Sequence, residues 1–267
     1  LVALLIATPA LLLPQQTADA SQIVLLVALL AAGLTFVEYN SNVPSIVEFR
    51  DAPPFNRLRF LALFFTVFLL TAIMKGKTDP TLLTHTLASV GTVIGQGIDF
   101  PYSPVRMVVL MLPHDASDQI VENVRTAAGL AYLMSLIAMT AFIVLVRIMG
   151  WPARHGAFNV WINLPLFDPT AGGDVLERLK RDARINIALG FLLPFIIPAV
   201  VKATADLVDP ISLEQPQTLI WTISAWAFLP ASMIMRGIAM SRIAEMIEEK
   251  RRRAYANAEQ NGEFQTA

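Results

Sequence analysis

Long runs of apolar residues, separated by short polar connectors, dominate the chain. A helix of about 20 mainly apolar residues crosses a hydrocarbon core about 30 Å thick. The runs lack the alternation of apolar and polar residues that membrane β-strands require, and a helix satisfies its own backbone hydrogen bonds in lipid. The pattern therefore predicts five transmembrane helices, near 22–37, 58–74, 126–146, 185–201 and 218–235.

A sixth apolar run, near 1–13, is open to two interpretations. It is short and is followed by small residues at 17–20, as in a secretory signal peptide before its cleavage site. However, no basic residues precede the run, and the sequence does not begin with methionine. We therefore favour a first transmembrane helix that is truncated in the given sequence.

The composition also indicates a membrane protein. Hydrophobic residues make up 55% of the 267 residues and charged residues only 15%, which is too apolar for an ordinary soluble domain. The absence of cysteine excludes disulfides, thiol nucleophiles and cysteine metal sites. We expect an all-α, polytopic helical membrane protein with five to six transmembrane helices in 1–236, and a C-terminal helix and tail in 237–267.

The placement of lysine and arginine predicts the orientation in the lipid bilayer. Fifteen of the 20 basic residues lie in the segments 38–59, 147–184 and 236–267. Loops rich in lysine and arginine stay on the cytoplasmic side of the membrane. We therefore expect the C-terminus to be cytoplasmic, and the N-terminus as well if 1–13 spans.

The connector at 166–184, LFDPTAGGDVLERLKRDAR, carries several local signals. The residues at 168–173 favour a tight turn, since aspartate bonds nearby backbone and glycine accepts positive φ. Asp174 is then placed as a helix N-cap, with Glu177 three residues later in a capping-box arrangement. The spacing predicts a helix that begins at the next residue.

This connector helix is amphipathic. Its basic side would lie close to anionic lipid headgroups, or the helix would simply extend the next span into water. The candidate interfacial residues are Asp174, Glu177, Arg178 and Arg181.

The loop at 81–113 forms the second candidate site, which we expect to be an amphipathic outer hairpin. Gly91 and Gly95 would permit close helix contact. The hairpin either re-enters the membrane with a polar stripe facing a cavity or lies on the outer surface with the stripe toward water, and we favour the surface. With a helical period, the stripe consists of His85, Ser89, Thr92 and Gln96.

Ionisable residues are scarce inside the predicted spans. Arg147, Lys202 and Arg236 lie at span ends, where long side chains reach the interface. Ion-coupled carriers usually keep an ionisable group inside the membrane, so active transport is disfavoured. Trp151 and Trp161 flank the connector and are expected to be interfacial anchors.

Motifs for catalysis are missing. The three histidines, His85, His114 and His155, are scattered, and neither H-E-x-x-H nor G-x-S-x-G occurs. We therefore expect no enzyme, no cofactor and no metal site. The basic C-terminal segment also carries three glutamates between 245 and 249, which disfavours nucleic-acid binding.

Three segments carry a resemblance: EFRDAPPFNRLRF (48–60), DFPYSPVR (99–106) and FNVWINLP (158–165). With them the chain resembles a family of uncharacterised polytopic inner-membrane proteins of alphaproteobacteria. The resemblance implies a bacterial inner membrane and assigns no activity or functional residue.

These observations favour a non-enzymatic scaffold or accessory subunit of a membrane complex, with another membrane protein or a second copy of the chain as its partner. The alternative is a passive channel or transporter that uses the 81–113 hairpin and the helix containing Pro194 and Pro198, because broken helices line transporter sites. An intramembrane enzyme is a third interpretation.

Overall fold

The computed structural model describes residues 1–14, 18–113, 115–152, 159–167, 172–204 and 213–260. These residues form helices joined by turns and loops, without strands. The helices are α1 (Val2–Leu12), α2 (Ala18–Asn40), α3 (Phe55–Lys75), α4 (Leu82–Ile98), α5 (Pro104–Leu110), α6 (Asp118–Arg147), α7 (Val160–Asn163), α8 (Val175–Ala203) and α9 (Pro216–Gln260).

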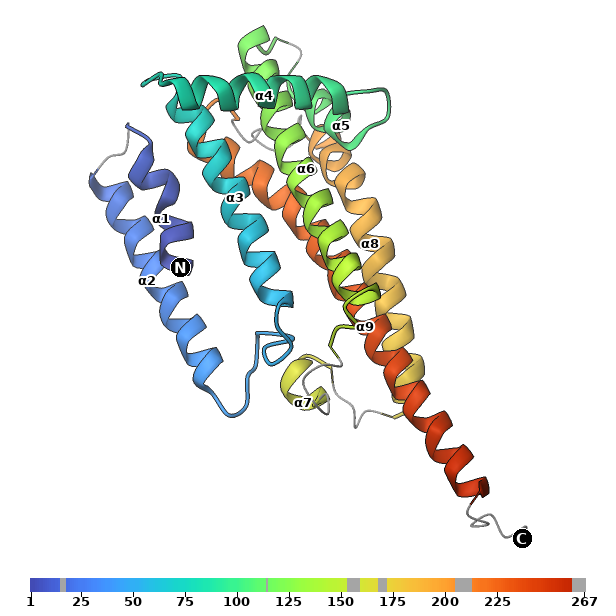
Figure 1. Cartoon of the computed structure of the whole chain (residues 1–267). Coiled ribbons are helices and arrows are strands. Elements are labelled where there is room, and N and C mark those ends of the chain that lie inside the picture. Colours follow the sequence, from blue (N-terminus) through green and yellow to red (C-terminus); the bar gives the residue numbers. More distant parts are fainter. Residues whose placement is uncertain (15–17, 114, 153–158, 168–171, 205–212, 261–267) are drawn as a thin grey trace.

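Five helices of the described chain, α2, α3, α6, α8 and α9, are long and apolar enough to cross a membrane. Each contains one of the five predicted spans, so the predicted polytopic all-α fold is confirmed. The first apolar run forms α1, which packs beside α2 and α3 (Figure 1). With 11 residues, α1 is about 16 Å long and shorter than the hydrocarbon core. Residue 17 of the predicted cleavage segment lies outside the described residues.

Helix α9 is the axis of the bundle. It packs against α8 along much of its length and also contacts α3 and α6, and its last turns project beyond the other helices (Figure 1). The predicted boundary between 236 and 237 falls inside this continuous helix. The C-terminal segment is therefore a direct extension of the last span, and 261–267 lie outside the described residues.

The connectors fold back over the bundle end that lies opposite α4 and form an aromatic cluster there. The rings of Phe49, Phe55 and Phe142 surround Trp151, with centroids 5.3–6.1 Å from its own. Trp151 is only 5% exposed, and its indole N–H donates to the Ala52 carbonyl at 3.0 Å. The prediction of an interfacial anchor at Trp151 is therefore wrong, because the ring is covered by Phe49 of the connector, Phe55 of α3 and Phe142 of α6. The Trp161 side chain is outside the described part of the chain.

Helix α4 lies across the opposite end of the bundle (Figure 1). Its crossing with α6 depends on glycine, as the hairpin prediction required. A Cβ built on Gly129 of α6 would lie 2.5 Å from the Gly95 Cα, and one on Gly91 would lie 2.8 Å from a Leu130 methyl carbon. The two backbones therefore touch at a point where no larger residue fits without movement.

We expect Gly129→Ala to lower the free energy of unfolding in detergent by about 1–3 kcal/mol, because the added methyl group overpacks a backbone contact. Gly97→Ala is the matched control, since Gly97 is in α4 with no atom within 4 Å of an added Cβ. It should leave stability unchanged or raise it by up to about 1 kcal/mol through helix propensity. Equal effects of the two substitutions on thermal or denaturant unfolding would contradict the close crossing.

Candidate functional site

The polar stripe of α4 faces away from the bundle along most of its length. The side chains of His85, Ser89 and Gln96 are exposed. Thr92 is half-buried, with its hydroxyl 3.4 Å from that of Thr126 in α6. The face that packs on α6 is instead the one with the small residues Gly91 and Gly95. The polar stripe is therefore not the face by which α4 packs on α6.

A buried carboxylate fixes the second half of this hairpin. Asp99 follows α4 and is 4% exposed at its side chain. One of its oxygens lies 2.8 Å from Arg106 Nε of α5, and the other lies 2.8 Å from Arg125 Nε of α6. One acidic group therefore joins the C-terminal end of α4 to two neighbouring helices.

The connector helix begins where the sequence predicts. Asp174 is the N-cap of α8 and accepts a hydrogen bond from the Leu176 amide at 3.0 Å. The hydrogen bonds of the described residues do not include a return bond from Glu177, whose side chain is exposed. The helix start thus has an N-cap without the expected capping box. The predicted turn at 168–171 lies outside the described residues.

The start of α8 is paired with α9. Asp174 makes two hydrogen bonds with the Arg251 guanidinium, at 3.0 and 2.9 Å, and Lys180 lies 2.7 Å from Glu248. Leu179 of α8 is fully buried in the same apolar cluster as Met240 and Ile243 of α9. We call residues 174–183 and 240–251 the α8–α9 stalk. The hydrogen bonds from Arg251 and from the backbone amide that Asp174 caps lower the pKa of the Asp174 carboxyl, so the pair persists until the pH falls below that lowered pKa.

The other two candidate connector residues have different surroundings. The Arg178 guanidinium lies 4.8 Å from the centre of the Phe167 ring, within the range of a cation–π contact. Arg181 is exposed and lies 3.5 Å from the neighbouring Asp182. The four candidates therefore do not converge on one ligand site. Residues 175–203 form one continuous helix, so Glu177, Arg178 and Arg181 belong to the same helix as the span.

A largely buried ion pair could not be predicted from the sequence. Arg236 was expected to reach the interface from a span end, but it lies inside α9 and binds Glu48 through two nitrogens, at 2.5 and 2.7 Å. Glu48 is 8% exposed, and its carbonyl accepts a hydrogen bond from the Asn56 side chain at 2.7 Å. The partners are 188 residues apart, so no spacing rule could have joined them. The only local signal was a glutamate within the 48–60 segment.

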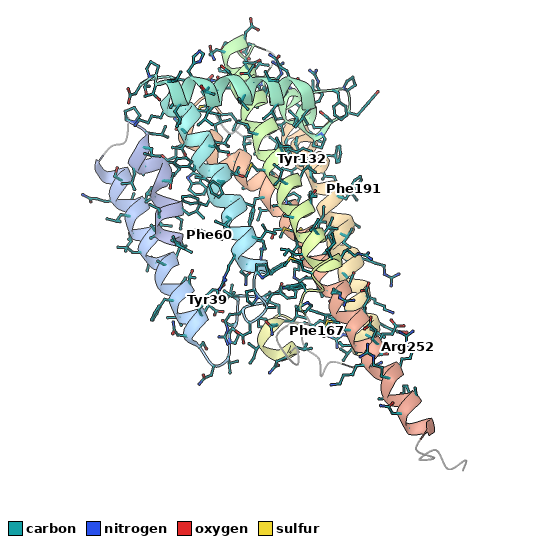
Figure 2. All side chains as sticks on the ribbon, viewed as in Figure 1. Tyr39, Phe60, Tyr132, Phe167, Phe191 and Arg252 are labelled. Atoms are coloured by element: carbon teal, nitrogen blue, oxygen red, sulfur yellow. The ribbon has the colours of Figure 1, made fainter. Side chains whose placement is uncertain are left out.

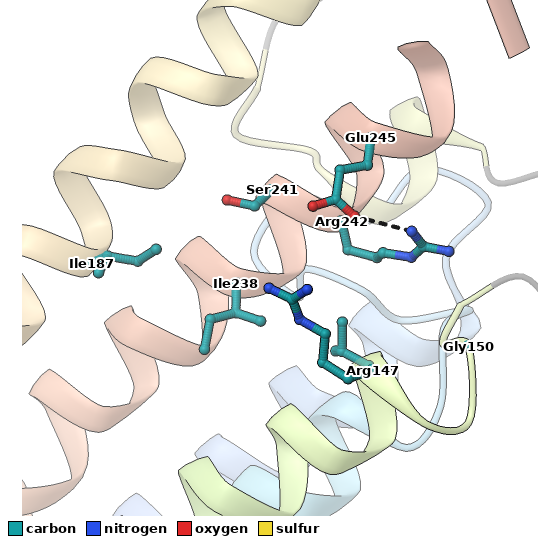
Figure 3. Close-up of a pocket in the computed structure, with 8 residues that line it drawn as sticks. Arg147, Gly150, Ile187, Ile238, Ser241, Arg242 and Glu245 are labelled. Atoms are coloured by element: carbon teal, nitrogen blue, oxygen red, sulfur yellow. Dashed lines mark hydrogen bonds and ion pairs between the residues drawn. The ribbon is translucent and has the colours of Figure 1, made fainter. Parts of the chain in front are cut away.

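A cavity of about 340 Å³ lies beside this end of the bundle, between α6, α8 and α9 (Figure 3). Arg242 of α9 is 3.0 Å from Glu245 at the rim. The remaining lining residues include apolar side chains from all three helices. The lining consists of Val146, Arg147, Gly150, Ile187, Ile238, Ser241, Arg242 and Glu245.

Comparisons with protein-family models, with curated proteins and with solved structures gave no match. Function is therefore inferred from the geometry of the stalk, the buried ion pair and the cavity.

We expect Glu48→Gln to lower the free energy of unfolding by about 3–5 kcal/mol, because it leaves the Arg236 charge without its partner in a largely buried site. Asp51→Asn is the control in the same connector, since Asp51 is 51% exposed beside Arg50. That change should stay within about 0.5 kcal/mol. Combining Glu48→Gln with Arg236→Met should restore part of the loss. A full, additive loss in the double variant, measured by denaturant unfolding in detergent, would show that the two side chains are not coupled.

Proposed function

We propose that the chain is a non-enzymatic membrane scaffold or accessory subunit, which presents the α8–α9 stalk and the end of α9 to a protein partner. The observation that carries this proposal is the length of α9. Its 45 residues give a helix about 68 Å long, more than twice the thickness of a hydrocarbon core of about 30 Å. The stalk contacts fix the direction of the part of α9 that extends beyond this thickness.

The projecting end of α9 has the character of a recognition surface. Beyond the stalk, Arg252 and Tyr255 are exposed, and Arg252 points away from the bundle (Figure 2). Arginine and tyrosine are enriched at protein interfaces. Because the stalk contacts hold α9 as far as Arg251, these side chains leave the bundle at a defined place, which lowers the entropy cost of binding a partner.

The channel alternative has less support from the described residues around Pro194 and Pro198. The Pro194 carbonyl, which a proline-broken helix would offer to a substrate, accepts the indole N–H of Trp226 at 3.1 Å. The cavity of about 240 Å³ next to Pro198 is lined almost wholly by apolar side chains. A dry cavity of this kind offers no path for ions or polar solutes.

The proposal includes the orientation predicted from charge, with a bacterial inner membrane as the location and the C-terminal end of α9 in the cytoplasm. The chain has no native cysteine, so single cysteines report cleanly. In intact spheroplasts, we expect cysteines at Gly172 and Ala254 to be protected from an impermeant thiol reagent and one at Asp115 to be labelled. The reverse pattern would mean that the orientation is inverted.

The scaffold role predicts a complex that depends on the end of α9. After mild extraction from native membranes, the full chain should migrate in native electrophoresis as a larger species than the purified protein alone. Deletion of 252–267 should abolish the larger species, while it keeps the stalk pairs Asp174–Arg251 and Lys180–Glu248. Deletion of 261–267 alone is the control and should retain it.

Flux measurements on the purified protein distinguish the scaffold from the channel. Purified protein in liposomes should give no solute flux above that of empty liposomes. A reproducible flux that changes with Gln96, together with a complex that survives deletion of 252–267, would replace the scaffold by a channel.

A further inference from the structure

We propose that the cavity between α6, α8 and α9 binds a phosphate group, and that an anionic phospholipid supplies it. The cavity volume of about 340 Å³ lies within the range of small-molecule sites, which begins at about 300 Å³. The cavity shares Ser241, Arg242 and Glu245 with the α8–α9 stalk, but the proposal does not rest on the scaffold function, because lipid binding is measured on the purified chain without a partner.

Arg147 provides the first binding group. It is the last residue of α6 and is exposed, and its guanidinium extends into the cavity beside Ile238 (Figure 3). No hydrogen bond or ion pair within the described part of the chain involves its side chain. A guanidinium has five N–H donors in a planar fork that matches phosphate, so Arg147 is available to a ligand.

Arg242 provides the second group. One of its terminal nitrogens lies 3.0 Å from Glu245 and 3.9 Å from Glu249. Its Nε is buried and has no hydrogen-bond partner among the described residues. A buried donor without an acceptor is costly, so a rotation of the Arg242 side chain that brings Nε to a phosphate oxygen in the cavity would be favoured. The Ser241 hydroxyl, which also lines the cavity, adds a further donor.

The position of the cavity favours a lipid as the source of the phosphate. Arg147 ends the apolar part of α6, from which we infer that the cavity lies at the level where headgroups meet the spans. Val146, Ile187 and Ile238 line it together with the arginines, which suits a ligand with a charged group next to apolar atoms. Basic pockets between transmembrane helices bind anionic headgroups in this way.

The two glutamates limit the strength of the site and provide its sharpest test. Glu245 competes with phosphate for Arg242, so Glu245→Gln should strengthen binding, whereas Arg147→Gln should weaken it. Arg184→Gln is the control, because Arg184 is an exposed arginine of α8 at the same end of the bundle and does not line the cavity. Opposite effects of two neighbouring substitutions would not arise from a general loss of folding.

The experiment is native mass spectrometry of the full chain in detergent, with phosphatidylglycerol or phosphatidylcholine added at known concentrations. We expect at least about five-fold tighter binding of phosphatidylglycerol, reduced about five-fold by Arg147→Gln and unchanged by Arg184→Gln. Competition by millimolar inorganic phosphate would identify soluble phosphate as the source and overturn the lipid assignment. Equal binding of the two lipids, or equal effects of the two arginine substitutions, would overturn the site.

Discussion

The close contact between α8 and α9 is the interaction on which the rest of the structure depends. A Cβ built on Gly190 of α8 would lie 2.6 Å from the Pro230 carbonyl oxygen, and one on Gly237 of α9 would lie 2.7 Å from that of Ala183. Lipid tails are as apolar as leucine side chains, so helices in a membrane associate mainly through such close packing. Helices α3 and α6 also pack on α9, and the contact between α8 and α9 continues into the stalk.

Two ion pairs at this end of the molecule connect further parts of the chain to α9. The Glu48–Arg236 pair ties the connector after α2 to α9, and the Asp174–Arg251 pair ties the start of α8 to α9. The first pair is largely buried, so it fixes the position of the connector on α9. The second pair is exposed, so it contributes little to the free energy of folding. Together they leave the end of α9 as the free part of a rigid body, which is the basis of the proposed scaffold function.

The spans could be predicted from the sequence because hydrocarbon imposes length and composition on each helix separately. The N-cap at Asp174 could also be predicted, since capping is local. Three features could not be predicted, because each depends on a partner far away in the sequence. They are the position of Arg236, the burial of Trp151 and the face that α4 uses for packing. In α4 the polar stripe was visible, but contact with Gly129 selects the small-residue face. The cavity was missed for the same reason, since its lining comes from three helices.

The central claim is that α8 and α9 form one rigid unit that extends beyond the bundle. Hydrogen–deuterium exchange of the full chain in lipid nanodiscs tests it directly, because paired helices open together and rarely. The account predicts that amides at 175–183 and 240–251 stay protected for minutes to hours, while those at 252–260 exchange much faster. Exchange at 175–183 as fast as at 252–260 would show that the stalk does not form.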